Sequence, residues 1–239
     1  MKINKAFTFL LISALAVGHA KAQSADEIVN KHIAAMGGKD KLKEMKTSYT
    51  EGIMEMHGME VPVKLWVVND KAVRMELEVM GNTNVQVATR TGGWMQMPIM
   101  GMPDPKPMDS AMVKIMQPRL DMAGELFDYK AKGKKVTLEG KETTGGVEAY
   151  KLKVTHPDGT EVHLFIDAAT YYLDRMQGQV KANGQAAEFA VTFSDYKKTS
   201  NGYAYPGSVS QEPGGTKISF TKMEVNNPVD DTLFQMPKK

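Results

Sequence analysis

Apolar residues occupy every second position over long stretches of this chain. The clearest runs are Val61/Val63/Leu65/Val67, Val73/Met75/Leu77/Val79, Tyr150/Leu152/Val154 and Val162/Leu164/Ile166. A period of two is typical of strands that place one face in a core and the other in water. Turn signals rich in Gly, Asn and Pro separate the runs, as at Gly81-Asn82 and Asn201-Gly202. The pattern therefore predicts a long antiparallel meander of about ten or eleven strands.

The parity of the apolar residues also predicts the register of one hairpin. Pro157-Asp158-Gly159 separates two of the runs, and a glycine in the left-handed conformation suits a loop of this kind. The apolar residues of the two strands must share one face, which fixes how the strands pair. The predicted pairs are Val154 with Val162, Leu152 with Leu164 and Lys153 with His163.

The chain near its start has the period of a helix instead. Ser24 and Glu27 form a capping box, in which each side chain can satisfy a free amide at a helix start. An apolar helical stripe follows, and Gly37-Gly38 ends it. Leu42 and Met45 indicate a second short helical turn.

Methionine dominates the stretch from residue 92 to 122. Pro103, Pro105 and Pro107 predict a stiff extended connection without ladder hydrogen bonds, and a helix is expected from about 109 to 122, with a kink or break at Pro118. The methionines are Met95, Met97, Met100, Met102, Met108, Met112, Met116 and Met122. Methionine is unbranched and polarizable, so such a surface packs around apolar partners of irregular shape. We expect a lid over the apolar face of the sheet that also binds ligand.

Many strands and few helices favour a mainly β (α+β) fold. The economical arrangement is a single curved antiparallel sheet, a half-open barrel that covers helices. A chain of this length can bury its core without disulfides. We therefore expect residues 23–239 to form one domain.

The first 22 residues have the features of a secretory signal peptide. Lys2 and Lys5 precede an apolar run from residue 6 to 17, and Ala20-Lys21-Ala22 predicts cleavage before Gln23. Removing the peptide changes the formal charge from +2 to −1. The chain has no cysteine, and therefore neither a disulfide nor the cysteine that anchors a lipoprotein. These features predict a soluble periplasmic protein and argue against nucleic acid as a partner.

The sequence contains no recognisable catalytic motif. A Walker loop, G-x-S-x-G, H-E-x-x-H and a cysteine nucleophile are all missing from it. The histidines fit surface or loop positions better than a ligand set. We therefore expect neither enzyme activity nor a cofactor.

The methionines leave one alternative chemistry open. Thioether and imidazole ligands select Cu(I), and two short clusters have this composition. Methionine also recurs at ordinary core positions such as Met36 and Met176, which favours its use as an apolar filler. The alternative is a periplasmic copper-binding protein that uses Met54, Met56, His57, Met59, Met95 and Met97.

Several short sequence motifs occur along the chain in a recognisable order. They are Gly93-Trp94, Phe165-Ile166-Asp167-Ala168-Ala169-Thr170-Tyr171-Tyr172-Leu173, Phe193-Ser194-Asp195-Tyr196-Lys197, Tyr205-Pro206 and the ending from residue 225 to 234. Their order and spacing resemble those of bacterial outer-membrane lipoprotein-sorting proteins, the LolA/LolB-like superfamily, over nearly the whole mature chain. The resemblance implies a half-barrel of about eleven strands, closed by helices over a hydrophobic cavity for acyl chains.

One feature departs from that family. Its lipoprotein carriers often have Arg-Pro just after the second long strand, where the arginine helps to hold the lid. This chain has Val68-Asn69-Asp70-Lys71 instead, and the nearby Arg74 is one candidate substitute.

The main hypothesis is a periplasmic carrier or sensor of a hydrophobic ligand, either a lipid or the acyl chains of a lipoprotein. The resemblance implies a transfer partner at the inner or outer membrane, and we expect a monomer. The residues predicted to line the cavity and its lid are Val63, Leu65, Leu77, Trp94, Met97, Met100, Met108, Met112, Met116, Leu152, Leu164, Phe189 and Phe193.

Overall fold

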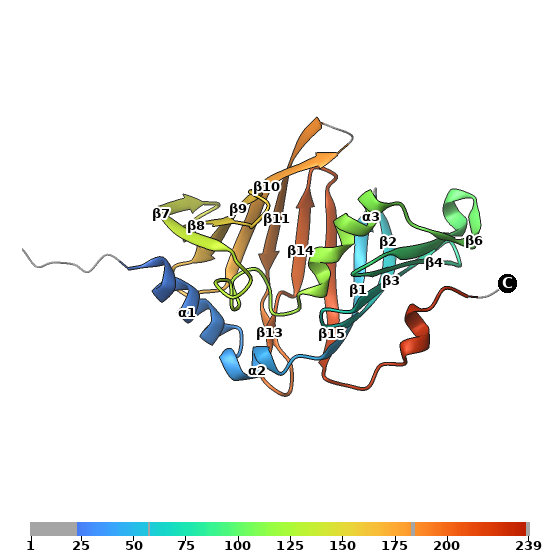
Figure 1. The fold of residues 1–239 in the computed structure, drawn as a ribbon, viewed down its shortest axis with the longest axis horizontal. Helices are drawn as coiled ribbons and strands as arrows, with labels where there is room; N and C mark the ends of the chain where they lie inside the picture. Colours follow the sequence, from blue (N-terminus) through green and yellow to red (C-terminus); the bar gives the residue numbers. More distant parts are fainter. Residues whose placement is uncertain (1–22, 57, 183–184, 238–239) are drawn as a thin grey trace, which may run out of the picture.

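One antiparallel sheet of thirteen strands dominates the computed structural model, which describes residues 23–56, 58–182 and 185–237 (Figure 1). The order across the sheet is β6-β5-β4-β3-β2-β1-β15-β14-β11-β10-β9-β8-β7. Its strands are β1 (Thr47–Met56), β2 (Met59–Val68), β3 (Ala72–Val79), β4 (Asn82–Thr89), β5 (Gly93–Met97), β6 (Met102–Pro107), β7 (Lys135–Thr144), β8 (Val147–Thr155), β9 (Glu161–Asp167), β10 (Leu173–Ala182), β11 (Gln185–Ser194), β14 (Ser208–Glu212) and β15 (Thr216–Val225). The short strands β12 (Lys197–Lys198) and β13 (Ala204–Tyr205) pair separately. The predicted signal peptide lies outside the described residues.

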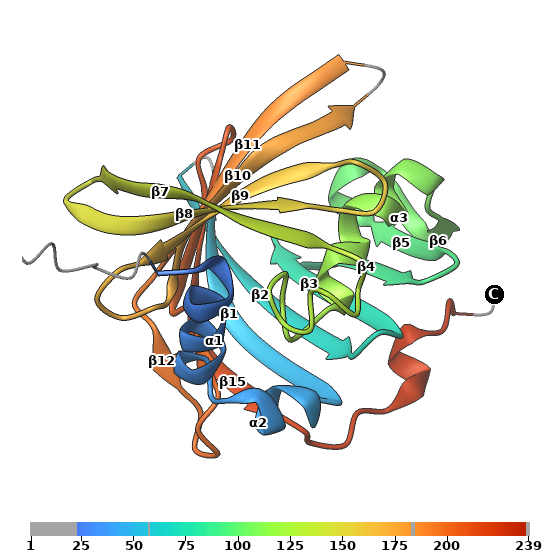
Figure 2. The same ribbon diagram turned by 60° about the vertical axis from the view of Figure 1, so that its left-hand side comes forward.

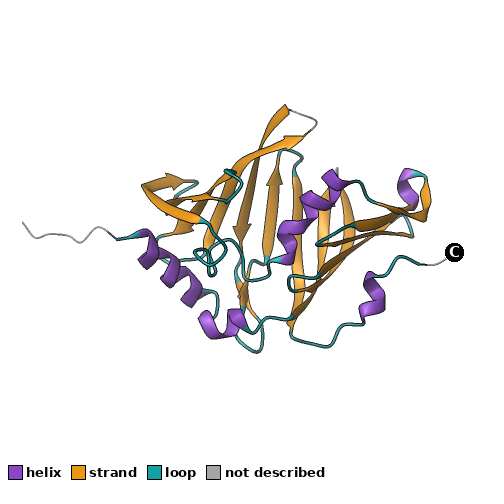
Figure 3. Cartoon of the chain, in the orientation of Figure 1, coloured by secondary structure: helices purple, strands orange, loops and turns teal. Residues whose placement is uncertain are grey.

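Short helices lie against this sheet (Figure 3). They are α1 (Ala25–Ala35), α2 (Lys39–Lys43), α3 (Ser110–Met116) and the 3-10 helices η1 (Pro98–Met100), η2 (Gln117–Leu120) and η3 (Asp231–Phe234). The sheet is strongly curved and twisted, and α1 and α3 lie on its concave side (Figure 2). We call this side the inner face and the opposite side the outer face.

The predicted fold class is confirmed: the chain forms one curved antiparallel sheet that is not closed into a barrel. Two of its thirteen strands lie where the sequence suggested no strand. One is β7, and the other is β6, which contains all three alternating prolines and pairs with β5. The prediction that this proline segment makes no ladder bonds is therefore wrong. Prolines are tolerated because β6 is an edge strand, which needs partners on one side only.

The predicted hairpin register is confirmed. Leu152 pairs with Leu164 and Val154 with Val162, while Lys153 faces His163 on the other side of the sheet. Gly159 has φ +83°, the left-handed conformation that glycine adopts without steric cost. The apolar residues thus fixed the register, because a slip by one position would turn all of them toward water.

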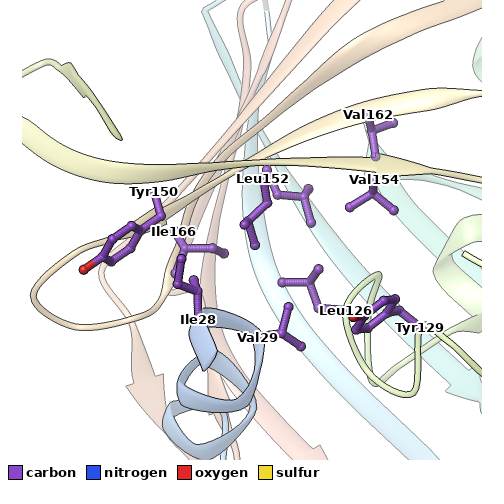
Figure 4. Close-up of a cluster of buried hydrophobic side chains, with 10 residues drawn as sticks. Ile28, Val29, Leu126, Tyr129, Tyr150, Leu152, Val154, Val162 and Ile166 are labelled. Carbon is purple, nitrogen blue, oxygen red and sulfur yellow. The ribbon is translucent and has the colours of Figure 1, made fainter. Parts of the chain in front are cut away.

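Helix α1 begins where the capping sequence predicts. The Ser24 side chain accepts a hydrogen bond from the Glu27 amide at 3.2 Å. Ile28 and Val29 then pack with Leu152 and Ile166 of the sheet (Figure 4). The loop between η2 and β7 adds further apolar side chains to this cluster, which closes one end of the inner face.

The second covering helix is shorter than predicted. Helix α3 ends at Met116, and the chain continues as η2 with Pro118 in its first turn. The break follows from the missing proline N–H and from its ring, which clashes with the preceding helical turn. The apolar residues of both pieces still pack against one part of the sheet.

The buried cluster beneath α1 provides a test of the fold. Leu152 has no exposed surface, so Leu152→Ala leaves a cavity and should lower the free energy of unfolding by roughly 2 to 5 kcal/mol. Ile115 is 68% exposed on α3, and Ile115→Ala should change stability by less than about 0.5 kcal/mol. Urea unfolding followed by circular dichroism measures both. Equal losses in the two variants would contradict this assignment of the core.

Candidate functional site

The inner face is closed at both ends, and part of the surface between them is only half-covered. The inner residues of β1 from Ser48 to Met54 are buried, whereas those of β11, β14 and β15 are mostly half-buried. The cluster beneath α1 closes one end, and a second cluster beneath α3 closes the other. Strand pairing aligns a row of apolar side chains between them, and each is half-buried. This row is Phe189, Val191, Phe193, Val209, Ile218 and Phe220. We call it, together with the half-buried Leu65, Met75 and Leu77 on the same face, the inner groove.

Charge is missing from the walls of this groove. The strand registers place Ser, Thr, Gly, Asn, Gln and apolar residues at the described inner positions of β1–β4, β9, β11, β14 and β15, and no Asp, Glu, Lys or Arg among them. An ionised ligand group placed there would lose its hydration without gaining a partner charge. The groove therefore suits an uncharged, apolar chain.

Two glycines shape the floor of the groove. A β-carbon on Gly178 would lie 3.1 Å from Cε1 of Phe189, and one on Gly52 would lie 3.1 Å from Cδ1 of Phe220. Each phenylalanine ring therefore lies directly over the backbone of a neighbouring strand. Larger residues at these two positions would push the rings away from the sheet.

The α3 segment, residues 108 to 120, packs on the inner face at one end of the groove. Met108, Val113, Met116 and Leu120 are buried against Val67, Val73 and Ala88 of the sheet. Met95, Met112 and Met122 pack around this cluster and stay half-buried. The segment thus presents flexible thioether side chains beside the half-covered strands.

Neutral hydrogen bonds hold both ends of the α3 segment. At its start, the Met108 amide donates to the Gly93 carbonyl at 2.9 Å. Toward its end, the Asp70 amide donates to the Leu120 carbonyl at 2.9 Å. The Gln117 side-chain amide donates to the carbonyls of Thr89 at 3.4 Å and Arg90 at 2.9 Å.

The segment Val68-Asn69-Asp70-Lys71 therefore supplies a latch without an arginine. The Asn69 side chain accepts a hydrogen bond from the Met122 amide at 3.2 Å, next to the Asp70 contact. Arg74 takes no part in it. Its guanidinium lies on the outer face, where it donates to the Leu233 carbonyl at 2.7 Å and pairs with Glu76, so the suggestion that Arg74 replaces the family's arginine is wrong.

The structure divides the residues predicted to line the cavity. Val63, Leu65, Leu77, Phe189 and Phe193 lie on the inner face at or beside the groove. Three of the predicted methionines, Met108, Met112 and Met116, pack in or around the cluster beneath α3. Met97 is buried on the inner side of β5, whereas Met100 is 67% exposed in η1. Leu152 and Leu164 are fully enclosed beneath α1 and line no open surface.

Trp94 does not share this face, contrary to the prediction. It pairs with Val87 on the outer face and packs against Phe234, whose carbonyl accepts a hydrogen bond from the Trp94 indole at 2.9 Å. The C-terminal segment from residue 228 to 234, which we call the strap, covers it there. When both faces of a strand are buried, its sequence does not show which face points to the inner side of the sheet. The alternation in sequence could therefore not place Trp94.

The two methionine clusters of the copper hypothesis are not brought together. Met54 lies on β1 and Met95 on β5, with three strands between them, a separation of about 19 Å at the usual strand spacing. Met54 and Met97 are buried on the inner side, and Met95 packs beside α3. Met56 and Met59 pair at the exposed end of the β1–β2 hairpin, and His57 lies outside the described residues. Within the described ranges, no three His, Asp or Glu side chains form a metal-binding group.

Membrane-spanning helices are also missing from the part of the chain that the structure describes. No helix there combines the length and apolar character needed to cross a bilayer.

Comparison with known proteins assigns the fold. No protein-family model matches the chain, and no curated protein matches it in sequence. A DUF1329 family protein from Desulfovibrio piger is similar in structure, with a TM-score of 0.59 and 15% identity over 90% of this chain and 98% of the other. A LolA superfamily protein from Nitrosomonas europaea gives a TM-score of 0.57 and 11% identity over 90% and 98%. A domain named for outer-membrane lipoprotein sorting, from Vibrio parahaemolyticus, gives 0.53 and 15% over 87% and 94%.

These similarities confirm the predicted LolA/LolB-like resemblance at the level of fold. The chain has a LolA-like curved sheet, and each match extends over nearly all of the other chain. Function has to be argued from the groove itself, because one fold hosts many functions.

The latch of the α3 segment can be tested by hydrogen exchange. Gln117→Ala removes two side-chain hydrogen bonds to the β4–β5 turn. Losing about 1 kcal/mol of local stability should speed amide exchange across residues 108 to 120 by about five-fold. Gln96→Ala is the matched control, because its amide donates to the Pro103 carbonyl away from α3. Unchanged exchange in the Gln117 variant would show that the latch does not hold the segment.

Proposed function

We propose that this protein is a non-enzymatic carrier or sensor that binds a long apolar ligand, a lipid or the acyl chains of a lipoprotein, in the inner groove. One observation carries the proposal: the row of half-buried side chains that runs across β11, β14 and β15 on the concave face is apolar and uncharged. Water contact with such a surface is unfavourable, and a ligand of matching chemistry removes it.

Apolar contact alone can contribute substantially to affinity. Each methylene transferred from water to an apolar surface contributes roughly 0.8 kcal/mol. Burying about ten of them yields roughly 8 kcal/mol, the free energy of a micromolar complex before the costs of association. Longer or paired acyl chains bury more methylenes and increase this contribution, which needs no charged contact.

The α3 segment serves as a lid in this proposal. It is short, its latch consists of neutral hydrogen bonds, and it presents methionines to the groove. Each of these hydrogen bonds is worth about 1 kcal/mol, so the buried apolar contacts of Met108, Val113, Met116 and Leu120 set the main cost of opening. Methionine side chains can then repack around ligands of different shape.

The proposed compartment is the periplasm. The signal-peptide features of residues 1–22 support export, and two of the similar structures carry the names of a LolA superfamily protein and a lipoprotein-sorting domain. We further propose residues 23–239 as one monomeric domain that exchanges its ligand with a partner at a membrane.

Two adjacent residues of β11 give a matched test of the groove. Val191 is half-buried on the inner face, and Thr192 is exposed on the outer face. Val191→Glu places a carboxylate beside the ligand and should weaken binding of a fluorescent long-chain fatty acid by at least about ten-fold. Thr192→Glu adds the same charge on the other side and should bind like the wild type.

Equal binding by the two variants, with β-structure preserved in circular dichroism, would exclude the groove as the site. If the wild type binds neither a fatty acid nor a lipopeptide, the carrier proposal is wrong. Stoichiometric Cu(I) binding by the same preparation would then favour the copper alternative.

The lid can be tested separately on one helix. Met112 is half-buried beside the inner-face cluster, and Ala111 is exposed on the same turn. Met112→Glu sets an unpaired carboxylate against apolar side chains, so α3 should open and dissociation of the fatty acid should accelerate by roughly ten-fold or more. Ala111→Glu should leave the dissociation rate unchanged. Stopped-flow displacement measures both, and identical rates would show that α3 does not cover the ligand.

A further inference from the structure

A second hollow lies on the outer face, on the other side of the sheet from the groove. It is a pocket of about 410 Å³ between β1, β2, β15 and the strap. Tyr49 and Trp66 form its aromatic wall, Glu224 and Asp230 contribute carboxylates, and Leu233 of η3 closes it from outside. Neither the fold nor the proposed carrier function accounts for this pocket.

The aromatic wall is built by direct strand pairing. Tyr49 of β1 pairs with Trp66 of β2, and their ring centroids lie 5.0 Å apart with a tilt of 36°. The Trp66 indole N–H donates to no acceptor among the described residues, unlike that of Trp94, which the Phe234 carbonyl satisfies. The pocket therefore offers two aromatic side chains to a ligand.

The surroundings of these rings are electronegative. The carboxylates of Glu51, Glu76, Glu224 and Asp230 lie around the pair on the outer face, with the cations Lys64, Lys222 and Arg74 among them. Lys222 pairs with Glu224 at 2.9 Å and Arg74 with Glu76 at 2.6 Å. Burial, together with the carboxylates of Glu51, Glu224 and Glu76, raises the pKa of Tyr49 to about 12. The Lys222 ammonium already lies 5.3 Å from the centre of the Tyr49 ring.

A positive charge over an aromatic face is attracted by the ring quadrupole, and nearby carboxylates add to this attraction. We propose that the outer-face pocket binds an organic cation, an ammonium group that lies over Tyr49 and Trp66 between Glu224 and Asp230. The group can belong to a free amine or to a lipid headgroup, since both present the same chemistry. The pocket is too small for a folded partner, and the strap limits it to a small group.

The two tryptophans of the chain provide the readout. In a spectrum of the 15N-labelled protein, choline should shift the Trp66 indole signal in a saturable way and leave that of Trp94 unchanged. The neutral isostere 3,3-dimethylbutan-1-ol has the same shape without the charge and should cause at least about ten-fold less shift at equal concentration. Added salt should weaken choline binding, because the charges are partly exposed.

Two conservative substitutions remove charge from the pocket. Glu224→Gln loses the ion pair with Lys222 at 2.9 Å but can still accept the hydrogen bond from the Asn227 side chain. Asp230 caps η3 by accepting a hydrogen bond from the Thr232 amide, and asparagine caps as well. Asp230→Asn combined with Glu224→Gln should weaken choline binding by at least about five-fold. Asp231→Asn is the matched control, because Asp231 is exposed and does not line the pocket.

Short-chain phosphatidylcholine below its micelle concentration identifies the source of the cation. If the phospholipid binds more tightly than free choline, the pocket recognises a lipid headgroup. If the two affinities are equal, the pocket recognises amines in general. Binding of the neutral isostere as tightly as choline would overturn the proposal, as would wild-type affinity in the double variant. Val191→Glu should bind choline with wild-type affinity, so the pocket proposal can be tested independently of the groove proposal.

Discussion

The structure depends on a mismatch between one wide apolar face and the short helices available to cover it. Thirteen strands at the usual spacing of about 4.8 Å extend over about 58 Å of curved sheet. Helix α1 has 11 residues and α3 has 7, so their lengths are about 16 and 10 Å. Even laid straight across the strands, the two helices reach over less than half of the sheet. Curvature brings more surface under each helix, yet the row of apolar side chains across β11, β14 and β15 stays half-buried. The proposed ligand site is the apolar surface that this shortage of cover leaves.

The two ends of the sheet are covered in different ways. Beneath α1, the helix and the following loop enclose their cluster completely, and Asp26 at the helix start also contacts Tyr129 and Lys130 of the loop. Beneath α3, the cover is a single short helix that a proline interrupts, and neutral hydrogen bonds latch it to two turns. The first arrangement adds an ion pair between Lys130 and Asp26 to its apolar packing. The second has apolar packing and no ion pair from residues 108 to 120 to any described residue. The lid proposal therefore assigns the movable wall of the groove to the α3 end.

Sequence periodicity predicted the strands well where only one face is apolar. The pairing of Leu152 with Leu164 follows from parity alone, and the structure agrees. Prediction of side-chain positions failed where the alternation of apolar and polar residues along a strand carries no information. Trp94 lies on a strand buried from both sides, because the strap covers the outer face there. In β7 the register shifts beside Gly140, so alternation changes phase within the strand. The latch escaped prediction for another reason: Asn69 and Gln117 are ordinary polar residues, and only the fold brings them to the ends of the α3 segment.

The two faces of the sheet have opposite electrostatic character, and this difference separates the two proposed ligands. On the outer face, charged side chains form cross-strand pairs, as between Lys153 and Glu161 at 3.4 Å and between Lys151 and Glu139 at 3.7 Å. Such pairs stay partly hydrated and contribute little stability, but they make that face unsuitable for an acyl chain. The inner face has no charge along its groove and offers nothing to an ammonium ion. Neighbouring residues of one strand, such as Tyr49 and Thr50, thus belong to surfaces of different chemistry. Side chains alternate between the two faces along each strand. This alternation is therefore sufficient to place the proposed apolar ligand and the proposed cation on opposite faces of a single sheet.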